Sequence, residues 1–208
     1  MGKTYAAALI TEALVHSGVN VGVYKPVASG CRLDGGKMIA DDALKLWESA
    51  GKPLSLDAVC PQKFLAPLAP PAAAADEGRS VNAELLRNGA VAWESNCDWL
   101  IIEGAGGLFS PLAEGVLNID LFLQFDNAQL VLVASNRLGV IHQTLATCAA
   151  AERQGVTVAG IILCCPQERR DDSADRNAAE IAKYTDVPVW AEIAFGQKTY
   201  PGDLSFFA

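Results

Sequence analysis

The second half of the chain alternates short apolar segments of strand type with segments of helical pattern, and this alternation limits the fold more than any other feature. Strand patterns cover residues 99–103, 130–134, 158–163 and 187–190, and helical patterns cover 140–153 and 173–184. Strands joined through helices of about 10–15 residues form parallel sheets that helices cover on both faces. We therefore predict an α/β fold with a doubly wound, mainly parallel sheet.

The first half of the chain fits the same architecture. Apolar residues have helical spacing over residues 4–17, Val19, Val21 and Val23 alternate as a short strand, and further helical patterns begin at Asp41 and cover 80–94. Five of the ten prolines lie between residues 53 and 71, which excludes a continuous helix or a central strand and indicates an extended connection with turns. No repeat or linker divides the chain, so we expect a single domain over residues 1–208.

Composition excludes several classes of protein. The chain has 208 residues, of which 51% are apolar and 19% charged, enough for one domain with a sizeable core. The net charge of −8, without a basic stripe, argues against binding to nucleic acid. Apolar runs are far shorter than the roughly 20 residues that span a membrane, and the N-terminus does not have the pattern of a signal peptide. The six cysteines show no zinc-type C-x-x-C spacing, which favours reduced thiols and a cytoplasmic protein.

Three short motifs carry residue types that bind phosphates and metal ions. Gly2, Lys3 and Thr4 match the last three positions of a P-loop, although three residues also suit an ordinary helix start. Lys25 ends a strand and precedes a loop that closes at Gly30, where the alternative is a surface lysine. Glu103 ends a strand and precedes a glycine-rich loop, which suits a metal-holding acid better than a simple turn.

Two helix starts complete the candidate residues. Asp41 and Asp42 open a helix, as metal-binding or simply capping acids, and the loop 137–139 precedes a helix whose N-terminus suits a carboxylate, or is a plain connection. Strand ends in a parallel sheet lie at one edge, so these features predict a site for a nucleotide, Mg²⁺ and a small acid. His16 and His142 have no third ligand at a fixed offset, and neither G-x-S-x-G nor a Cys/His pair supports covalent hydrolysis.

The chain resembles the dethiobiotin synthetases over nearly its whole length and in the right order. The resemblance lies in Gly2-Lys3-Thr4, residues 24–30 (YKPVASG), 41–44, 64–70 (FLAPLAP), 103–111 (EGAGGLFSP), Leu138-Gly139 with its helix, and Val158-Ala159-Gly160. It implies a P-loop NTPase-like α/β domain that forms homodimers. It also implies an ATP- and Mg²⁺-dependent ligase of biotin synthesis, which closes the ring of dethiobiotin from 7,8-diaminononanoate and CO₂.

The resemblance implies roles for individual residues. Lys3 and Lys25 would stabilise the transferring phosphoryl group. Thr4, Asp42 and Glu103 would hold Mg²⁺. The diamine substrate would contact Ser29 and Gly106, and its carboxylate would lie at Leu138, Gly139 and His142, in the family a contribution of the partner subunit. The nucleotide-binding residues implied are Gly2, Lys3, Thr4, Glu103, Gly104, Gly106, Cys164 and Ala191.

Four features depart from the family pattern. The first strand and the first half of the phosphate loop do not precede Gly2, and a GTG valine codon read as the start would produce Met1, so we hypothesise a misplaced start. Cys164 stands where the family has a purine-reading asparagine, Ala191 and Ala194 replace the Gly and Pro of the base-side loop, and His142 replaces an asparagine. A thiol is a poor substitute for an amide, so nucleotide choice is expected to be looser or altered.

Two other functions remain open on sequence alone. Another ligase of this fold, such as a relative of cobyrinic acid diamide synthase, would normally carry an additional glutamine-hydrolysing domain. A catalytically degenerate relative acting as a scaffold would have no electrostatic reason to keep Lys25, Asp42 and Glu103 together. Mg²⁺-dependent ATP binding separates an enzyme from a scaffold.

Overall fold

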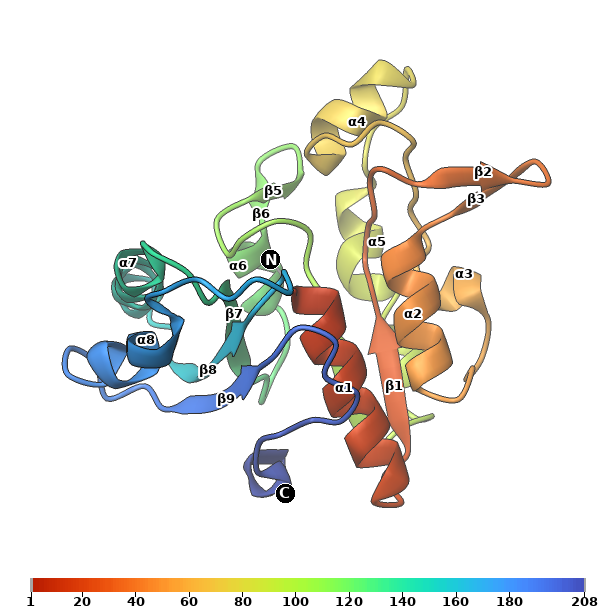
Figure 1. The fold of residues 1–208 in the computed structure, drawn as a ribbon. Helices are drawn as coiled ribbons and strands as arrows, with labels where there is room; N and C mark the ends of the chain where they lie inside the picture. The colour runs from red at the N-terminus through yellow and green to blue at the C-terminus, as the bar shows by residue number, and fades with distance from the viewer. Residues whose placement is uncertain (1, 208) are drawn as a thin grey trace. The chain divides into compact units, whose positions relative to one another are not determined.

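Parallel strands with helices between them form the framework of the computed structural model, which describes residues 2–207 (Figure 1). Strands β7 (Leu130–Ser135), β8 (Val158–Cys164) and β9 (Val189–Ile193) form a three-stranded parallel sheet in that order. Strands β1 (Val21–Tyr24) and β4 (Trp99–Ile102) form a separate parallel pair. The predicted mainly parallel α/β fold is therefore confirmed, with its parallel strands in two sheets.

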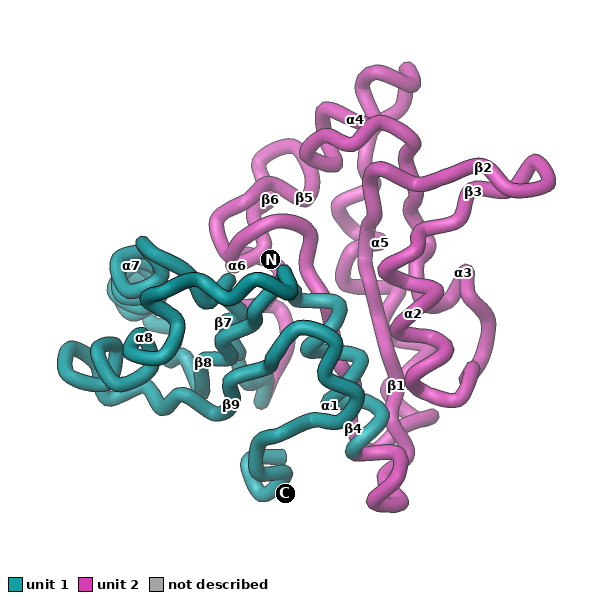
Figure 2. Tube along the Cα trace, in the orientation of Figure 1, with its two compact units in different colours: residues 1–13, 127–208 teal, residues 14–126 magenta. Residues whose placement is uncertain are grey.

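The chain is organised as two compact units (Figure 2). Unit 1 contains residues 1–13 and 127–208, and unit 2 contains residues 14–126. Helix α1 (Lys3–His16) begins in unit 1 and ends in unit 2. None of the helices within residues 2–207 is long and apolar enough to cross a membrane.

Unit 1 places its helices beside the three-stranded sheet. Helix α7 (Val140–Arg153) packs on β7, β8 and α8 (Ala174–Ile181), and a 3₁₀ turn, η2, covers Leu204–Phe207. Strand β8 is the middle strand and is almost entirely buried, as expected for an apolar run in a parallel sheet. The core of this unit is formed by side chains from α7, β8 and α8: Val140, Ile161, Leu163 and Ile181.

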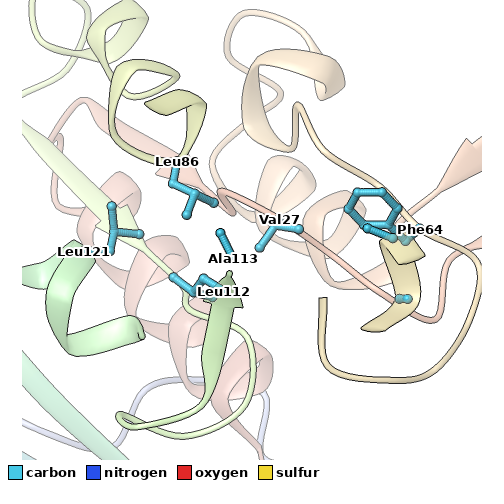
Figure 3. Close-up of a cluster of buried hydrophobic side chains, with 8 residues drawn as sticks. Val27, Phe64, Leu86, Leu112, Ala113 and Leu121 are labelled. Atoms are coloured by element: carbon cyan, nitrogen blue, oxygen red, sulfur yellow. The ribbon is translucent and has the colours of Figure 1, made fainter. Parts of the chain in front are cut away.

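Unit 2 surrounds its two parallel strands with short elements. The helices are α2 (Asp41–Ser49), α3 (Leu56–Val59), α4 (Pro70–Asp76), α5 (Ala83–Asn88) and α6 (Asn118–Phe122), with a 3₁₀ turn, η1, at Val91–Trp93. Two antiparallel hairpins join β2 (Arg32–Asp34) to β3 (Lys37–Ile39), and β5 (Pro111–Ala113) to β6 (Val116–Leu117). Figure 3 shows the buried cluster of this unit, in which Val27, Leu86, Leu112, Ala113 and Leu121 meet, with Phe64 to one side.

The structure corrects two of the predicted elements. The helix expected over residues 80–94 is broken into α5 and η1, because the hydroxyl of Tyr24 shares its single hydrogen between the carbonyls of Leu85 and Leu86. The amide of Ala90 consequently bonds the carbonyl of Arg87 in a tighter turn. The strand expected over 187–190 is shifted to Val189–Ile193, since Pro188 has no N–H to donate to a sheet.

Several small elements were not predicted from the sequence. The β2–β3 hairpin turns at Gly35 and Gly36, which both have positive φ, and the β5–β6 hairpin turns at Gly115. Consecutive glycines between short polar strands are a hairpin signal. The short helix α3 lies within the proline-rich connection, between Pro53 and Pro61.

Candidate functional site

Strand register brings Lys25 and Glu103 together in unit 2. Tyr24 of β1 is opposite Ile102 of β4, so the next residue on each parallel strand, Lys25 and Glu103, lies at the same edge. The amide of Glu103 donates to the carbonyl of Tyr24 at 2.9 Å, and the amide of Lys25 donates to Val59 at 2.8 Å. Both side chains therefore project from strand ends that are fixed by backbone hydrogen bonds.

Lys25 contacts two carboxylates. Its Nζ is 2.7 Å from Oε1 of Glu103 and 3.3 Å from Oδ2 of Asp42. The side chains of Lys25 and Glu103 are each only 4% exposed, whereas that of Asp42 is 54% exposed. This buried ammonium group thus faces one buried carboxylate and one carboxylate that solvent or a ligand reaches.

The charge on Lys25 is stabilised in spite of its burial. Burial by itself lowers the pKa of Lys25, but the carboxylates of Glu103 and Asp42 outweigh it and raise this pKa above its ordinary value. Lys25 is therefore a cation at neutral pH, suited to stabilising anionic phosphate oxygens and unsuited to accepting a proton.

The two aspartates at the start of α2 have different partners. Asp41 contacts Arg32, with Oδ1 2.9 Å from Nε, and Asp42 contacts Lys25. The residue at the N-cap is Ala40, and no side chain caps this helix, so neither aspartate is the cap. The sequence left open whether these acids were only structural; the structure separates them and brings Asp42 to Lys25.

The glycine-rich loop after β4 continues from Glu103. The carbonyl of Gly104 is 3.5 Å from Nζ of Lys25. Gly106 has φ +77°, a conformation that favours glycine, and an added Cβ there would lie 2.5 Å from Oγ of Ser110. The hydroxyl of Ser29, another predicted site residue, donates to the carbonyl of Leu68 at 2.6 Å.

Unit 1 contains the remaining predicted residues. Gly2 has φ +97° and precedes α1, whose first residues are Lys3 and Thr4. A Cβ added to Gly2 would lie 2.8 Å from Cβ of Cys164, so this glycine packs directly on the end of β8. The thiol of Cys164 points to the carbonyl of Gly2, with Sγ and O 3.9 Å apart.

The expected base-reading positions are both buried. Cys164 is 2% exposed and Ala191, on the neighbouring strand β9, is 7% exposed. Burial is the main cause that raises the pKa of the Cys164 thiol to about 12, so this thiol is neutral at physiological pH. Cys164 therefore contacts Gly2 with an uncharged thiol.

The loop before α7 is exposed. Leu138 is 82% exposed, Gly139 has φ +93° at the N-cap of α7, and His142 is exposed in the first turn of that helix. The amide of Leu138 donates to Oδ1 of Asp171 at 3.2 Å. The helix thus begins at a glycine that adopts a left-handed conformation, with no side-chain cap.

Some residues of the site were missed by the sequence analysis. Asn118 and Ser110 bond the backbone of the glycine-rich loop; Asn118 belongs to no motif, and Ser110 lies in the segment 103–111 but was given no role. Within residues 2–207, no group of three or more His, Cys, Asp or Glu side chains is arranged to hold a metal ion. The carboxylates of Asp42 and Glu103 around Lys25 are therefore the acidic part of the candidate site.

Comparison with known proteins identifies the family. A model described as an AAA domain matches residues 1–200. The ATP-dependent dethiobiotin synthetase BioD of Rhodopirellula baltica is 43% identical over 203 residues, covering 93% of this chain and 79% of that protein. The BioD of Idiomarina loihiensis is 35% identical over 208 residues, covering 99% and 93%. The chain belongs to the dethiobiotin synthetase family.

A solved structure supports the fold. A ParA family ATPase from Chlorobium tepidum matches with a TM-score of 0.53 and 20% sequence identity, over 95% of this chain and 79% of that one. At this identity the likeness concerns the fold alone. The resemblance to the dethiobiotin synthetases and the predicted P-loop NTPase-like α/β class are both confirmed.

Proposed function

We propose that this chain is an ATP-dependent dethiobiotin synthetase, which uses 7,8-diaminononanoate, CO₂ and ATP. One substrate amine and CO₂ form a carbamate, which takes the γ-phosphoryl group of ATP and releases ADP. The second amine then displaces phosphate and closes the ring. The observation that carries this proposal is the contact of Lys25 with Glu103 and Asp42 at adjacent strand ends, in a member of this family.

Lysine side chains would stabilise the phosphoryl group during transfer. Charge develops on the phosphoryl oxygens, so a fixed cation lowers the barrier without itself reacting. Lys25 suits this role because its pKa is raised and its strand end is fixed by hydrogen bonds. Lys3, at the start of α1, is assigned the same role by its place in the Gly2-Lys3-Thr4 motif.

The acidic side chains and Thr4 are suited to Mg²⁺. Carboxylate and hydroxyl oxygens are hard ligands, and Mg²⁺ in phosphoryl-transfer sites uses one or two carboxylates together with substrate phosphates and water. Asp42 and Glu103 provide two carboxylates that converge on one point, the ammonium of Lys25. The bound ion would neutralise charge on the phosphates of ATP, and Thr4, Asp42 and Glu103 would hold it.

The organic substrate would contact two segments. Ser29 and Gly106 lie in the loops after β1 and β4 and would bind the diamine end. The exposed residues Leu138, Gly139 and His142 at the N-terminus of α7 would take the carboxylate, where backbone N–H groups and the helix dipole favour an anion. As a homodimer, the enzyme would receive this second segment from the partner subunit.

The nucleotide would be held by Gly2, Lys3, Thr4, Glu103, Gly104 and Gly106, with Cys164 and Ala191 toward the base. A buried thiol and a methyl group offer little to distinguish the hydrogen-bonding edges of purines. We therefore expect weaker selection among nucleotide bases than an amide at position 164 would give. The proposed setting is the cytoplasm, where its thiols remain reduced.

Product formation tests the function directly. The chain, and a form extended upstream to the next in-frame start, are incubated with ATP, Mg²⁺, bicarbonate and 7,8-diaminononanoate, and phosphate and dethiobiotin are measured. We expect one phosphate for each dethiobiotin, with no dethiobiotin when the diamine, ATP or Mg²⁺ is omitted. Lys25→Ala and Glu103→Ala should each abolish turnover.

The same experiment separates the alternatives. Absence of nucleotide binding and of turnover in both forms would favour a scaffold. ATP hydrolysis with another amide-forming substrate, but not with the diamine, would favour a different ligase. Relatives that are named as dethiobiotin synthetases favour neither of these outcomes.

A further inference from the structure

The side chain of Asn118 binds the backbone of the glycine-rich loop that follows β4. Nδ2 of Asn118, the first residue of α6, is 2.8 Å from the carbonyl oxygen of Ala105, 2.8 Å from that of Gly107 and 2.9 Å from that of Ser110. An amide nitrogen has two hydrogens, so three carbonyls share them. Asn118 thus collects the carbonyls of a six-residue span around a single donor group.

Further hydrogen bonds reinforce this attachment. The backbone N–H of Asn118 donates to the carbonyl of Ser110 at 3.1 Å, and the backbone N–H of Ile119 donates to the carbonyl of Leu108 at 3.0 Å. Within the loop, the amide of Gly107 donates to Oγ of Ser110 at 2.9 Å. The first residues of α6 therefore hold the loop almost entirely by bonding the carbonyl oxygens of the loop.

The other side of the loop consequently presents N–H groups. In a trans peptide the N–H points opposite to the carbonyl of the preceding residue. Because the carbonyls of Ala105 and Gly107 point to Asn118, the amides of Gly106 and Leu108 point away from it. Within residues 2–207 neither amide has a hydrogen-bond acceptor, so both are available to an anion.

The same contact explains why position 104 is glycine. A Cβ added to Gly104 would lie 2.1 Å from Oδ1 of Asn118, a distance that no rotation of a Cβ relieves. This Oδ1 atom is buried and has no hydrogen-bond partner among the described residues, so it is held there by the donors on the opposite side of the amide. Gly104 and Asn118 therefore fit each other.

We infer that Asn118 is a positioning residue for phosphoryl transfer: it holds the carbonyls of Ala105, Gly107 and Ser110 toward α6, so that the amides of Gly106 and Leu108 face anionic oxygens. This inference rests on the proposed function, since the anion is a phosphate group of the reacting nucleotide. Asn118 acts through the loop and does not contact the reacting atoms.

Two substitutions and a matched control test this role. Asn118→Asp keeps the shape but replaces the donor with an oxygen that faces three carbonyls, and Asn118→Ala removes the side chain. Asn82→Ala is the control, because Asn82 also bonds backbone in unit 2, where its Oδ1 accepts from Leu85 at the start of α5. Hydrogen exchange is followed at the amides of Gly107, Ser110 and Ile119.

We expect both Asn118 variants to exchange at least about tenfold faster at these three amides, because the side-chain hydrogen bonds that hold the loop are lost. The amides of β4 should exchange at the wild-type rate. In turnover assays, kcat should fall at least about tenfold with KM for ATP changed less than about threefold, since the amides act on charge that develops in the transition state. Asn82→Ala should leave both measurements near wild type.

Loop exchange that stays at the wild-type rate in both Asn118 variants would overturn the inference. So would a kcat loss no greater than that of Asn82→Ala. The exchange measurement needs no substrate. If the wild-type chain and its extended form make no dethiobiotin while loop exchange is accelerated, the proposed function fails and the anchoring by Asn118 stands.

Discussion

At the scale of single residues, Lys25 and Glu103 form a buried ion pair that substitution should disturb strongly. Both side chains are 4% exposed; removal of Lys25 takes away the cation beside the buried Glu103 carboxylate, whereas removal of Glu103 leaves Lys25 in contact with Asp42. We expect Lys25→Met to lower the free energy of unfolding by about 3–5 kcal/mol and Glu103→Gln to lower it by less, while the double variant is less destabilised than the sum of the two. Urea titration of all four proteins gives the coupling, and additive effects would show that the pair contributes no mutual stabilisation.

Two buried thiols, also single residues, make the free energy of unfolding depend on pH in the alkaline range. Burial raises the pKa of Cys60 to about 12, as it does for Cys164, above the ordinary thiol value. Between about pH 9 and 12 the unfolded chain has lost these protons and the folded chain keeps them, so stability falls as pH rises. The raised pKa of Lys25 acts in the same direction at higher pH.

We therefore expect stability that is constant from pH 7 to 8.5 and then declines by up to about 1.4 kcal/mol per pH unit for each thiol. Thermal unfolding from pH 7 to 11 measures this decline. A Cys60→Ala/Cys164→Ala variant is the control, and its curve should be flatter above pH 9. An equally steep curve in that variant would assign the decline to other groups.

The sequence identifies residues that share a strand end and misses those that act through packing. Lys25 and Glu103 follow strand patterns, and parallel strands put such positions at one edge. Asn118 is one asparagine directly after the β5–β6 hairpin, which was not predicted. No sequence pattern distinguishes it from the other asparagines of the chain. Its role depends on three carbonyls whose direction is fixed only by the folded loop.

At the scale of elements, Gly160 of β8 leaves space for the indole ring of Trp190 on the paired strand β9. A Cβ added to Gly160 would lie 2.2 Å from the indole ring of Trp190. Trp190 in turn stacks on Phe206, with ring centroids 4.8 Å apart, and contacts Phe207 edge-on. The glycine thus makes room for an aromatic cluster that attaches the C-terminal turn to the sheet.

Gly160→Ala should displace this ring. We expect a loss of about 1–3 kcal/mol in the free energy of unfolding, together with a changed near-ultraviolet circular dichroism spectrum, because overpacked cores shift their aromatic side chains. Trp190→Leu in the Gly160→Ala background removes the clash and should recover part of the loss relative to Trp190→Leu alone. Equal effects of Gly160→Ala in both backgrounds would place the cause elsewhere.

Helices could be predicted from the sequence where a long periodic pattern determines the element and no distant residue interrupts it. The 14 residues of α7 match the predicted bounds because the periodic segment begins directly after Gly139. The helix expected over residues 80–94 failed because the hydroxyl of Tyr24, from β1, bonds the carbonyls of Leu85 and Leu86. A local pattern does not report a hydrogen bond from a residue 61 positions away.

At the scale of the whole molecule, each unit contains a sheet with an apolar edge strand. Within residues 2–207, β4 pairs only with β1 and β7 pairs only with β8. Both edge strands are half-buried throughout and contain no charged residue or proline, which are the usual protections of a sheet edge. Unpaired N–H and C=O groups along such an edge favour the addition of another strand.

We therefore expect the unpaired amides of β4 and β7 to exchange with solvent at least about tenfold faster than the amides of β8, which is paired on both sides. Successive N–H groups of a strand point to opposite sides, so exchange along β4 and β7 should alternate between fast and slow, while exchange along β8 should be slow throughout. Hydrogen exchange resolved by residue measures this pattern. Uniformly slow exchange along β4 or β7 would contradict the expectation, because it would show that another segment already covers that edge.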